Sequence, residues 1–150
     1  EMTHFPVVSY EDVKTLTDYE RIIYFGALYA GGVKGLKNTV KKLSPNTKLI
    51  IVTVGLADVC DPENISNIRN SIRKQVPEHL LKAASVFHLR GGIDYSKLNF
   101  KHRTMMKMLY HSLKSKPDES LTQEDKIFIE TYNKKVDFVD YDSLKQIAEL

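Results

Sequence analysis

Three short apolar runs, each closed by glycine within two residues, constrain the fold of this sequence more than any other feature. They are RIIYF at 21–25, KLIIVTV at 48–54 and SVFHL at 85–89. Continuous apolar runs of this length are typical of strands that are covered on both faces of a parallel sheet. Helical segments separate the runs, and this alternation predicts an α/β fold with helices on both sides of the sheet.

The helical segments are marked by spacing and by capping residues. Apolar residues recur at helical spacing over 33–43 and again over 65–76, where Asp61 and Pro62 form a helix start and Pro77 a stop. The stretch 93–135 is longer than a normal connection and predicts two helices, at about 99–114 and 122–132. We also expect an extended stretch at 3–8, a helical turn at 10–16, a last short strand at 136–139 and a final helix at 143–150.

Composition narrows the class of protein. The 150 residues suit one domain, 1–150, and a formal charge of +3 is too small to indicate nucleic-acid binding. A single cysteine, Cys60, excludes an intramolecular disulfide, is typical of the reducing cytoplasm and is expected to be a small buried hydrophobe. The start of the sequence does not have the pattern expected of a signal peptide, and no apolar run approaches the roughly 20 residues of a membrane span. Neither the histidines nor the cysteine show metal-ligand spacing, so we assign no metal site and no catalytic residue.

Glycine-rich segments follow all three apolar runs, and the first of them, GALYAGGVKG at 26–35, is expected to be a loop. The carboxyl ends of parallel strands meet at one edge of the sheet, and ligands of such sheets bind beyond that edge, where the strand order reverses. We therefore expect the segments that follow Phe25, Val54 and Leu89 to form one binding edge. A response-regulator receiver domain, which shares the sheet order, is excluded because Gly26-Ala27 stands where it needs a phosphorylatable Asp.

Four stretches resemble a known family. DYERIIYFGALYAGG, KLIIVTVGLAD, VFHLRGGIDYSKLNFKHRTMMKML and VDFVDYDSL are similar to flavodoxin-domain proteins related to menaquinone-dependent protoporphyrinogen dehydrogenase, and the resemblance covers about 3–150. It implies a flavodoxin-like three-layer sandwich with a parallel sheet, a long insertion before the last strand, and flavin mononucleotide (FMN) as cofactor.

The resemblance also implies a segment that the sequence does not show. Proteins of this family open with a strand, a Ser/Thr- and Gly-rich phosphate loop and a helix, and none of these precedes Thr3. Such a unit occupies on the order of 30 residues, and its strand is central in the order 2-1-3-4-5. We expect the natural protein to carry this segment and the present chain to bind FMN weakly or not at all without it. The alternative is that Met2 is the natural start.

The resemblance assigns two walls of a flavin-ring site. The first wall consists of Gly26, Ala27, Leu28, Tyr29, Ala30 and Gly31, and the second of Val54, Gly55, Leu56, Ala57 and Asp58. Glycine allows a backbone to approach the ring edge closely. Tyr29 either stacks on the ring or packs on the surface of a strand-to-helix connection. Asp58 either accepts a hydrogen bond from the ring or orients its own loop.

A third segment is expected to border the substrate side of the flavin through Arg90, Gly92, Asp94 and Tyr95. Arg90 suits a carboxylate such as a porphyrin propionate, although a surface salt bridge is the favoured alternative. The helix at 99–114 carries an apolar stripe and several basic residues. These residues suit either peripheral contact with an anionic membrane surface or, as we favour, packing on the domain with a solvated basic face.

These features leave three functions open. The first is an FMN-dependent oxidoreductase that oxidises a porphyrinogen and passes electrons to a quinone, with the redox chemistry carried by the flavin. The second is a flavodoxin-like electron carrier for a redox partner protein. The third is a non-catalytic scaffold that has lost flavin.

Overall fold

The computed structural model describes residues 5–29 and 31–149. A four-stranded sheet has the order β2-β1-β3-β4, with β1 at Arg21–Tyr29, β2 at Gly32–Val33, β3 at Lys48–Gly55 and β4 at Ser85–Arg90. Strands β1, β3 and β4 are parallel, with Tyr24 opposite Ile51 and Val52 opposite Phe87. The predicted α/β class with a mostly parallel sheet is confirmed.

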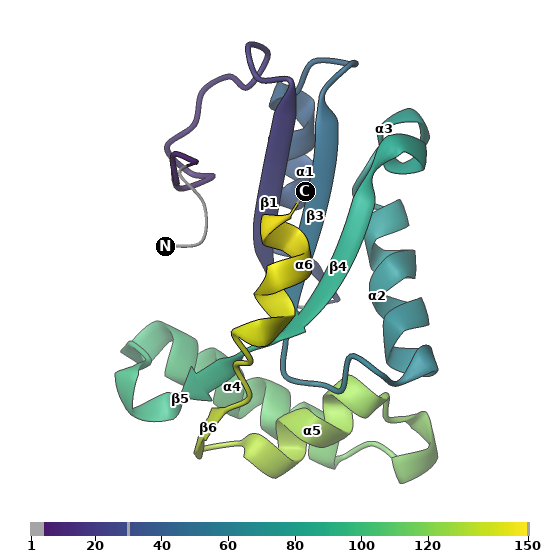
Figure 1. Cartoon of the computed structure of the whole chain (residues 1–150). Coiled ribbons are helices and arrows are strands. Elements are labelled where there is room, and N and C mark those ends of the chain that lie inside the picture. The colour runs from purple at the N-terminus through teal and green to yellow at the C-terminus, as the bar shows by residue number, and fades with distance from the viewer. Residues whose placement is uncertain (1–4, 30, 150) are drawn as a thin grey trace.

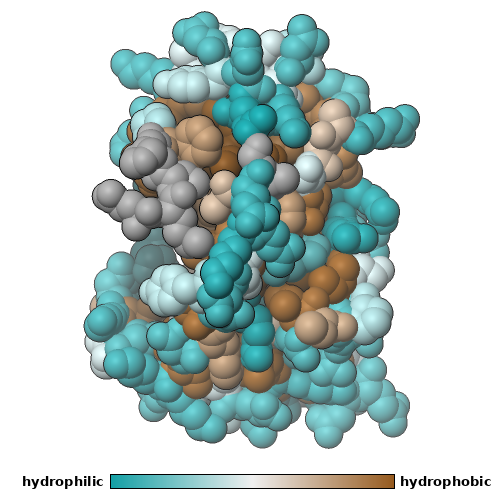
Figure 2. Space-filling view, in the orientation of Figure 1, coloured by the Kyte–Doolittle hydropathy of each residue, from teal (hydrophilic) through white to brown (hydrophobic). Residues whose placement is uncertain are grey.

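Helices cover both faces of this sheet (Figure 1). On one face, α1 (Leu36–Thr39), the 3₁₀ helix η1 (Val40–Lys42), α2 (Pro62–Arg73) and α3 (Glu78–Ala83) bury an aliphatic core. On the other face, η4 (Asp142–Leu144) and α6 (Lys145–Ala148) pack Ile147 against Ile50 and Val52. Figure 2 shows apolar surface on both sides of the hydrophilic exterior of α6, which leaves this second face only partly covered.

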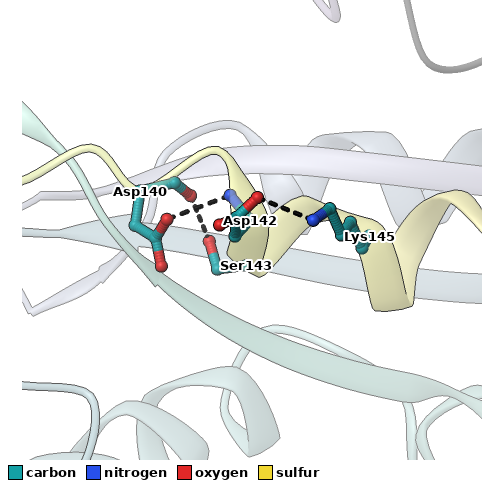
Figure 3. A network of polar contacts seen from close by, with 4 residues as sticks. All are labelled: Asp140, Asp142, Ser143 and Lys145. Carbon is teal, nitrogen blue, oxygen red and sulfur yellow. Dashed lines mark hydrogen bonds and ion pairs between the residues drawn. The ribbon is translucent and has the colours of Figure 1, made fainter.

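A polar network sets the entry of the chain into α6 (Figure 3). The Asp140 carboxylate accepts a hydrogen bond from the Asp142 amide at 2.9 Å, and the Ser143 hydroxyl donates to the Asp140 carbonyl at 2.5 Å. The Lys145 ammonium then pairs with Asp142 at 2.8 Å. These local contacts turn the chain so that Ile147 faces the sheet.

A separate unit lies beyond the carboxyl ends of the parallel strands (Figure 1). Its elements are β5 (Gly92–Asp94), η2 (Tyr95–Lys97), α4 (Phe100–Lys114), η3 (Asp118–Ser120), α5 (Gln123–Thr131) and β6 (Lys135–Asp137). The two long helices agree with the prediction, and Asn99 and Thr122 cap them as side-chain acceptors. We call residues 92–137 the insertion.

Several local predictions are wrong. The 26–32 segment is not a loop, because β1 continues to Tyr29 and turns back through β2, and the 33–43 helix is split between α1 and η1. The 136–139 strand does not join the main sheet: β6 pairs with β5 in an antiparallel ribbon. Residues 5–8 form no strand, residues 10–12 form only a turn, and residues 3 and 4 lie outside the described chain.

One edge of β1 is open. Strand β3 pairs with β1 along one edge from Arg21 to Ala27, whereas β2 meets the opposite edge only at Leu28 and Tyr29. No other described strand pairs with that second edge between Ile22 and Gly26. On the partly covered face, Phe25 is 52% exposed beside this edge. The open edge and the exposed phenyl ring together form an incomplete border of the sheet.

Candidate functional site

The three glycine-rich segments meet at the carboxyl edge of the sheet, as the sequence predicts. The Gly91 amide donates to the Gly55 carbonyl at 2.7 Å, which joins the ends of β3 and β4. A Cβ atom on Gly55 would lie 2.7 Å from Leu28, and one on Gly91 would lie 2.6 Å from Val54. Glycine at these two positions therefore allows the strand ends to close together. We call the edge formed by 26–29, 54–58 and 90–91 the rim.

Tyr29 ends β1 at this rim. Its side chain is 40% exposed, and its hydroxyl lies 2.6 Å from the Met105 sulfur in α4. The ring is thus neither buried in the domain nor fully free, and it links the rim to the insertion. Ala30 lies outside the described residues, and Gly31 has a φ of +76° with open space where a Cβ would stand.

The segment that follows β3 contains amide groups without a protein acceptor, and Ala57 within it is buried. Within the described chain, the N–H groups of Leu56, Ala57 and Asp58 donate to no protein acceptor. The Asp58 carboxylate accepts from the Cys60 amide at 2.8 Å, and the Asp58 carbonyl accepts from the buried Asn64 side chain at 2.7 Å. Asp58 therefore orients its own loop, one of its two predicted roles. Cys60 is exposed in this turn, which contradicts its expected burial.

The Arg90 side chain makes its contacts within the protein. Its guanidinium donates two hydrogen bonds to the Leu56 carbonyl, at 3.1 and 2.8 Å, and lies 3.9 Å from the centroid of the Phe138 ring. The Gly91 carbonyl accepts from the Phe138 amide at 3.1 Å. Arg90 thus fixes the 56–58 segment against the chain that leaves β6, and it forms no ion pair within the described residues. The favoured surface salt bridge is not what the structure shows.

The other residues of the third segment have structural contacts. The Asp94 carboxylate accepts from the Ser96 hydroxyl at 2.6 Å and from the Ser96 amide at 3.0 Å, and these bonds lower the pKa of Asp94. Tyr95 is buried against Tyr132, and burial raises the pKa of Tyr95 to about 12. Gly92 lies in β5, where a Cβ would stand 2.7 Å from the Val136 carbonyl. Their roles toward a substrate stay predictions.

The structure also brings together residues that the sequence interpretation left unassigned. The Thr53 hydroxyl lies 2.7 Å from His88 Nδ1 across β3 and β4, and burial, with a smaller effect of Arg69, lowers the pKa of His88. Two surface hollows of about 270 and 520 Å³ share Arg69 and Arg73 of α2. The sequence could have predicted the contact between Thr53 and His88 only if the pairing of β3 with β4 were already known, because the two residues lie opposite each other in that pairing.

Comparison with known proteins decides the family. The sequence model of the flavodoxin domain matches residues 2–120. The chain belongs to the flavodoxin domain family. Family membership suggests a flavin-binding redox function in general, and flavodoxin domains typically bind FMN. Comparison with curated proteins and with solved structures gives no match.

The described residues of this flavodoxin domain fit the ring of FMN better than its phosphate. Free amides at 56–58 and the exposed ring of Tyr29 suit the hydrogen-bonding edge and the flat face of a flavin ring. A phosphate needs free amides at a helix start. The first amides of α2 are already taken, because the Asp61 carboxylate accepts from Glu63 at 2.8 Å and from Asn64 at 3.3 Å.

No described helix is both long and apolar enough to cross a membrane. The described residues likewise contain no group of three or more His, Cys, Asp or Glu side chains placed to hold a metal ion.

Proposed function

We propose that the rim holds the ring of FMN and that the protein is an FMN-dependent oxidoreductase. The observation that carries this proposal is the set of free amides of Leu56, Ala57 and Asp58 beside the exposed Tyr29 ring, in a chain of the flavodoxin domain family. When bound, FMN supplies the electron-transfer chemistry. The protein residues bind and orient it.

Each residue of the rim has a distinct role in this proposal. The free amides of 56–58 donate hydrogen bonds to the polar edge of the ring, and Tyr29 covers one of its faces. Arg90 holds the 56–58 segment in place through the Leu56 carbonyl, so that these amides are positioned before the cofactor binds. Gly55 and Gly91 keep the strand ends close enough for one ring to touch both walls.

We further propose that the phosphate is held by a strand–loop–helix unit whose strand pairs with the open edge of β1. In the flavodoxin strand order, FMN lies at the switch point between the first and third strands. Strands β1, β3 and β4 correspond to the third, fourth and fifth strands of that order, so the position beside β1 is that of the first. The edge of β1 from Ile22 to Gly26, along which no described strand pairs, and the exposed Phe25 support this placement.

The finer activity that we propose is oxidation of a porphyrinogen-like substrate with a quinone as electron acceptor, on the cytoplasmic side. It is supported by the resemblance to protoporphyrinogen dehydrogenase relatives and by the insertion, which lies next to the rim (Figure 1). A flavodoxin-like carrier would instead need only a redox partner protein.

The test is a titration of the protein, expressed from its complete gene, with FMN. Quenching of the flavin fluorescence measures the binding. We expect near-stoichiometric binding, and Tyr29→Leu should weaken it about twofold to tenfold, as expected for loss of one aromatic contact. Tyr19→Leu is the matched control, since Tyr19 is also an exposed tyrosine but precedes β1 at the opposite end of the sheet.

Three outcomes separate the candidate functions. A colourless protein that ignores added FMN contradicts the proposal and leaves the scaffold. A flavoprotein that oxidises protoporphyrinogen with a quinone acceptor supports the oxidoreductase. A flavoprotein that exchanges electrons only with a partner protein is a carrier.

A further inference from the structure

One segment of the insertion, residues 95–117, is strongly basic. Between Asp94 and Asp118 the sequence contains no Asp or Glu and six basic residues, namely Lys97, Lys101, Arg103, Lys107, Lys114 and Lys116. The whole chain carries a formal charge of only +3, so the remainder is net acidic. The ion pairs of the described residues are Lys82 with Glu78 and Lys145 with Asp142, so none of the six is neutralised by a salt bridge.

Helix α4 divides into an inner and an outer side. On the inner side, Leu113 is buried and the Tyr110 ring stacks on Tyr132 with 4.1 Å between ring centroids. This packing agrees with the favoured prediction that the helix lies on its own domain.

The outer side of α4 carries large apolar groups as well as charge. Phe100 is 87% exposed and Met108 is 69% exposed. They lie eight residues apart on one ridge of the helix, with the exposed Thr104 between them, at about 12 Å by the rise of an α-helix. Lys101 and Lys107 lie on opposite sides of this ridge by helical spacing. The outer side of α4 thus combines exposed apolar side chains with exposed lysines.

We propose that the outer side of α4 is a docking surface for an anionic lipid bilayer. Phe100 and Met108 enter the headgroup boundary, while Lys101 and Lys107 extend along it and pair with lipid phosphates. An apolar ridge flanked by cations is the pattern of helices that lie in the membrane interface. The ridge is convex, which a deformable headgroup layer accommodates, whereas a protein partner would need a matching groove.

Docking through this surface also has a consequence for the rim. The Tyr29 hydroxyl lies 2.6 Å from Met105 of the same helix, so α4 is anchored directly beside the carboxyl edge of the sheet. A bilayer seated on the outer side of α4 is therefore separated from the rim by the thickness of one helix. The docking proposal itself rests only on α4 and does not require FMN.

The experiment is co-sedimentation of the full natural protein with vesicles. One set contains only phosphatidylcholine and the other about one third phosphatidylglycerol, a proportion that gives a strongly negative surface. We expect at least about tenfold stronger partitioning onto the anionic vesicles, and a loss of most of it when NaCl is raised from about 0.1 to 0.5 M, because salt screens the attraction.

Two double variants separate the apolar and the charged contributions. Phe100→Ser with Met108→Ser, and Lys101→Gln with Lys107→Gln, should each lower anionic-vesicle binding at least about fivefold. Lys37→Gln with Lys41→Gln is the matched charge control and Val7→Ser the apolar control, and both should retain binding, since these exposed residues lie outside the insertion. Unchanged circular dichroism and FMN titration of the variants show that folding and the rim are intact.

Clear results overturn the proposal. It fails if the protein ignores both kinds of vesicle, if it binds phosphatidylcholine equally well, or if the two double variants bind like the controls. It also fails if the protein binds poly-glutamate or duplex DNA through Lys101 and Lys107 while ignoring vesicles, because the surface would then serve an acidic polymer. Since the vesicle sedimentation itself uses no flavin, failure of docking and failure of FMN binding are distinguishable.

Discussion

The parallel sheet and the insertion use different side chains to hold their shape. In the sheet, Leu49, Ile50, Ile51 and Val52 of β3 are fully buried between helices on both faces. In the insertion, packing centres on tyrosines, with Tyr95 and Tyr110 against Tyr132 and a buried Tyr95 hydroxyl that has no partner among the described residues. The sheet thus provides a rigid frame for the rim, whereas the insertion is a polar and aromatic layer that covers one end of it.

The difference locates stability and function in different parts of the molecule. The close-packed aliphatic core fixes the strand ends and hence the rim. The insertion buries fewer side chains and leaves Phe100 and Met108 in solvent. Segments of this kind carry binding functions more often than they carry stability. Substitutions in the two regions should therefore separate the free energy of unfolding from ligand and membrane binding.

The largest expected effect is in the centre of β3. Ile51→Ala should lower the free energy of unfolding by about 2–5 kcal/mol, because it removes a fully buried side chain and leaves a cavity in the core. Met108→Ala in α4 should change it by about 0.5 kcal/mol or less, since this side chain is mostly exposed. Urea unfolding at neutral pH measures both. Equal losses would show that the insertion and the sheet are one cooperative core.

Two glycines with nearly the same backbone conformation sharpen the comparison. Gly35 has a φ of +79° and Gly31 a φ of +76°, so an alanine at either position costs about 1–2 kcal/mol from the left-handed conformation alone. A Cβ on Gly35 would also lie 2.5 Å from the Tyr10 ring and 2.7 Å from the Tyr24 hydroxyl, whereas one on Gly31 would meet open space.

The steric clash of a new Cβ atom arises only at Gly35, which packs against the core. Gly35→Ala should therefore destabilise the protein by about 2–4 kcal/mol, which adds overpacking to backbone strain, and Gly31→Ala by about 1–2 kcal/mol. Urea unfolding of the two variants at one pH gives the difference. If Gly31→Ala proves the more costly, the turn between β1 and β2 is more tightly packed than the described contacts show.

The sequence predicts the sheet better than the rim, for physical reasons. Continuous apolar runs identify β1, β3 and β4, because burial on both faces requires them. The glycines after Phe25 suggest a loop, yet Gly26 lies inside β1. Glycine is required at this position because a Cβ atom there would clash with Val33 of β2. That contact depends on a hairpin that local pattern does not reveal.

Long-range contacts explain the remaining differences in the site. Arg90 bonds the Leu56 carbonyl, 34 residues away, and no sequence spacing predicts such a pair. Likewise, the VDFV run identifies an extended segment but not its partner, and β6 pairs with β5 instead of the main sheet. The meeting of the three segments at one edge was predictable because it follows from the direction of parallel strands alone.

The smallest expected effect is a pH dependence that belongs to the sheet and not to the insertion. His88 lies on β4 with Nδ1 2.7 Å from the Thr53 hydroxyl, and burial lowers the pKa of His88, with a smaller contribution from Arg69. The unfolded chain then binds a proton at higher pH, near the usual value of about 6.5, than the folded chain does. Stability is therefore fully present above about pH 6.5 and falls as the pH drops toward the folded-state pKa.

His88→Gln should remove this dependence. Its urea midpoint should be lower at pH 7.5, because the bond to Thr53 is altered, but it should fall less than that of the natural protein between about pH 7 and 5.5. Carboxylates titrate mainly below that window, so they contribute little to the slope. His79→Gln is the control, since His79 is exposed on α3 and should leave the slope unchanged. If both variants keep the natural slope, the pH response does not arise at His88, and the interior beside Thr53 is more open to water than its burial indicates.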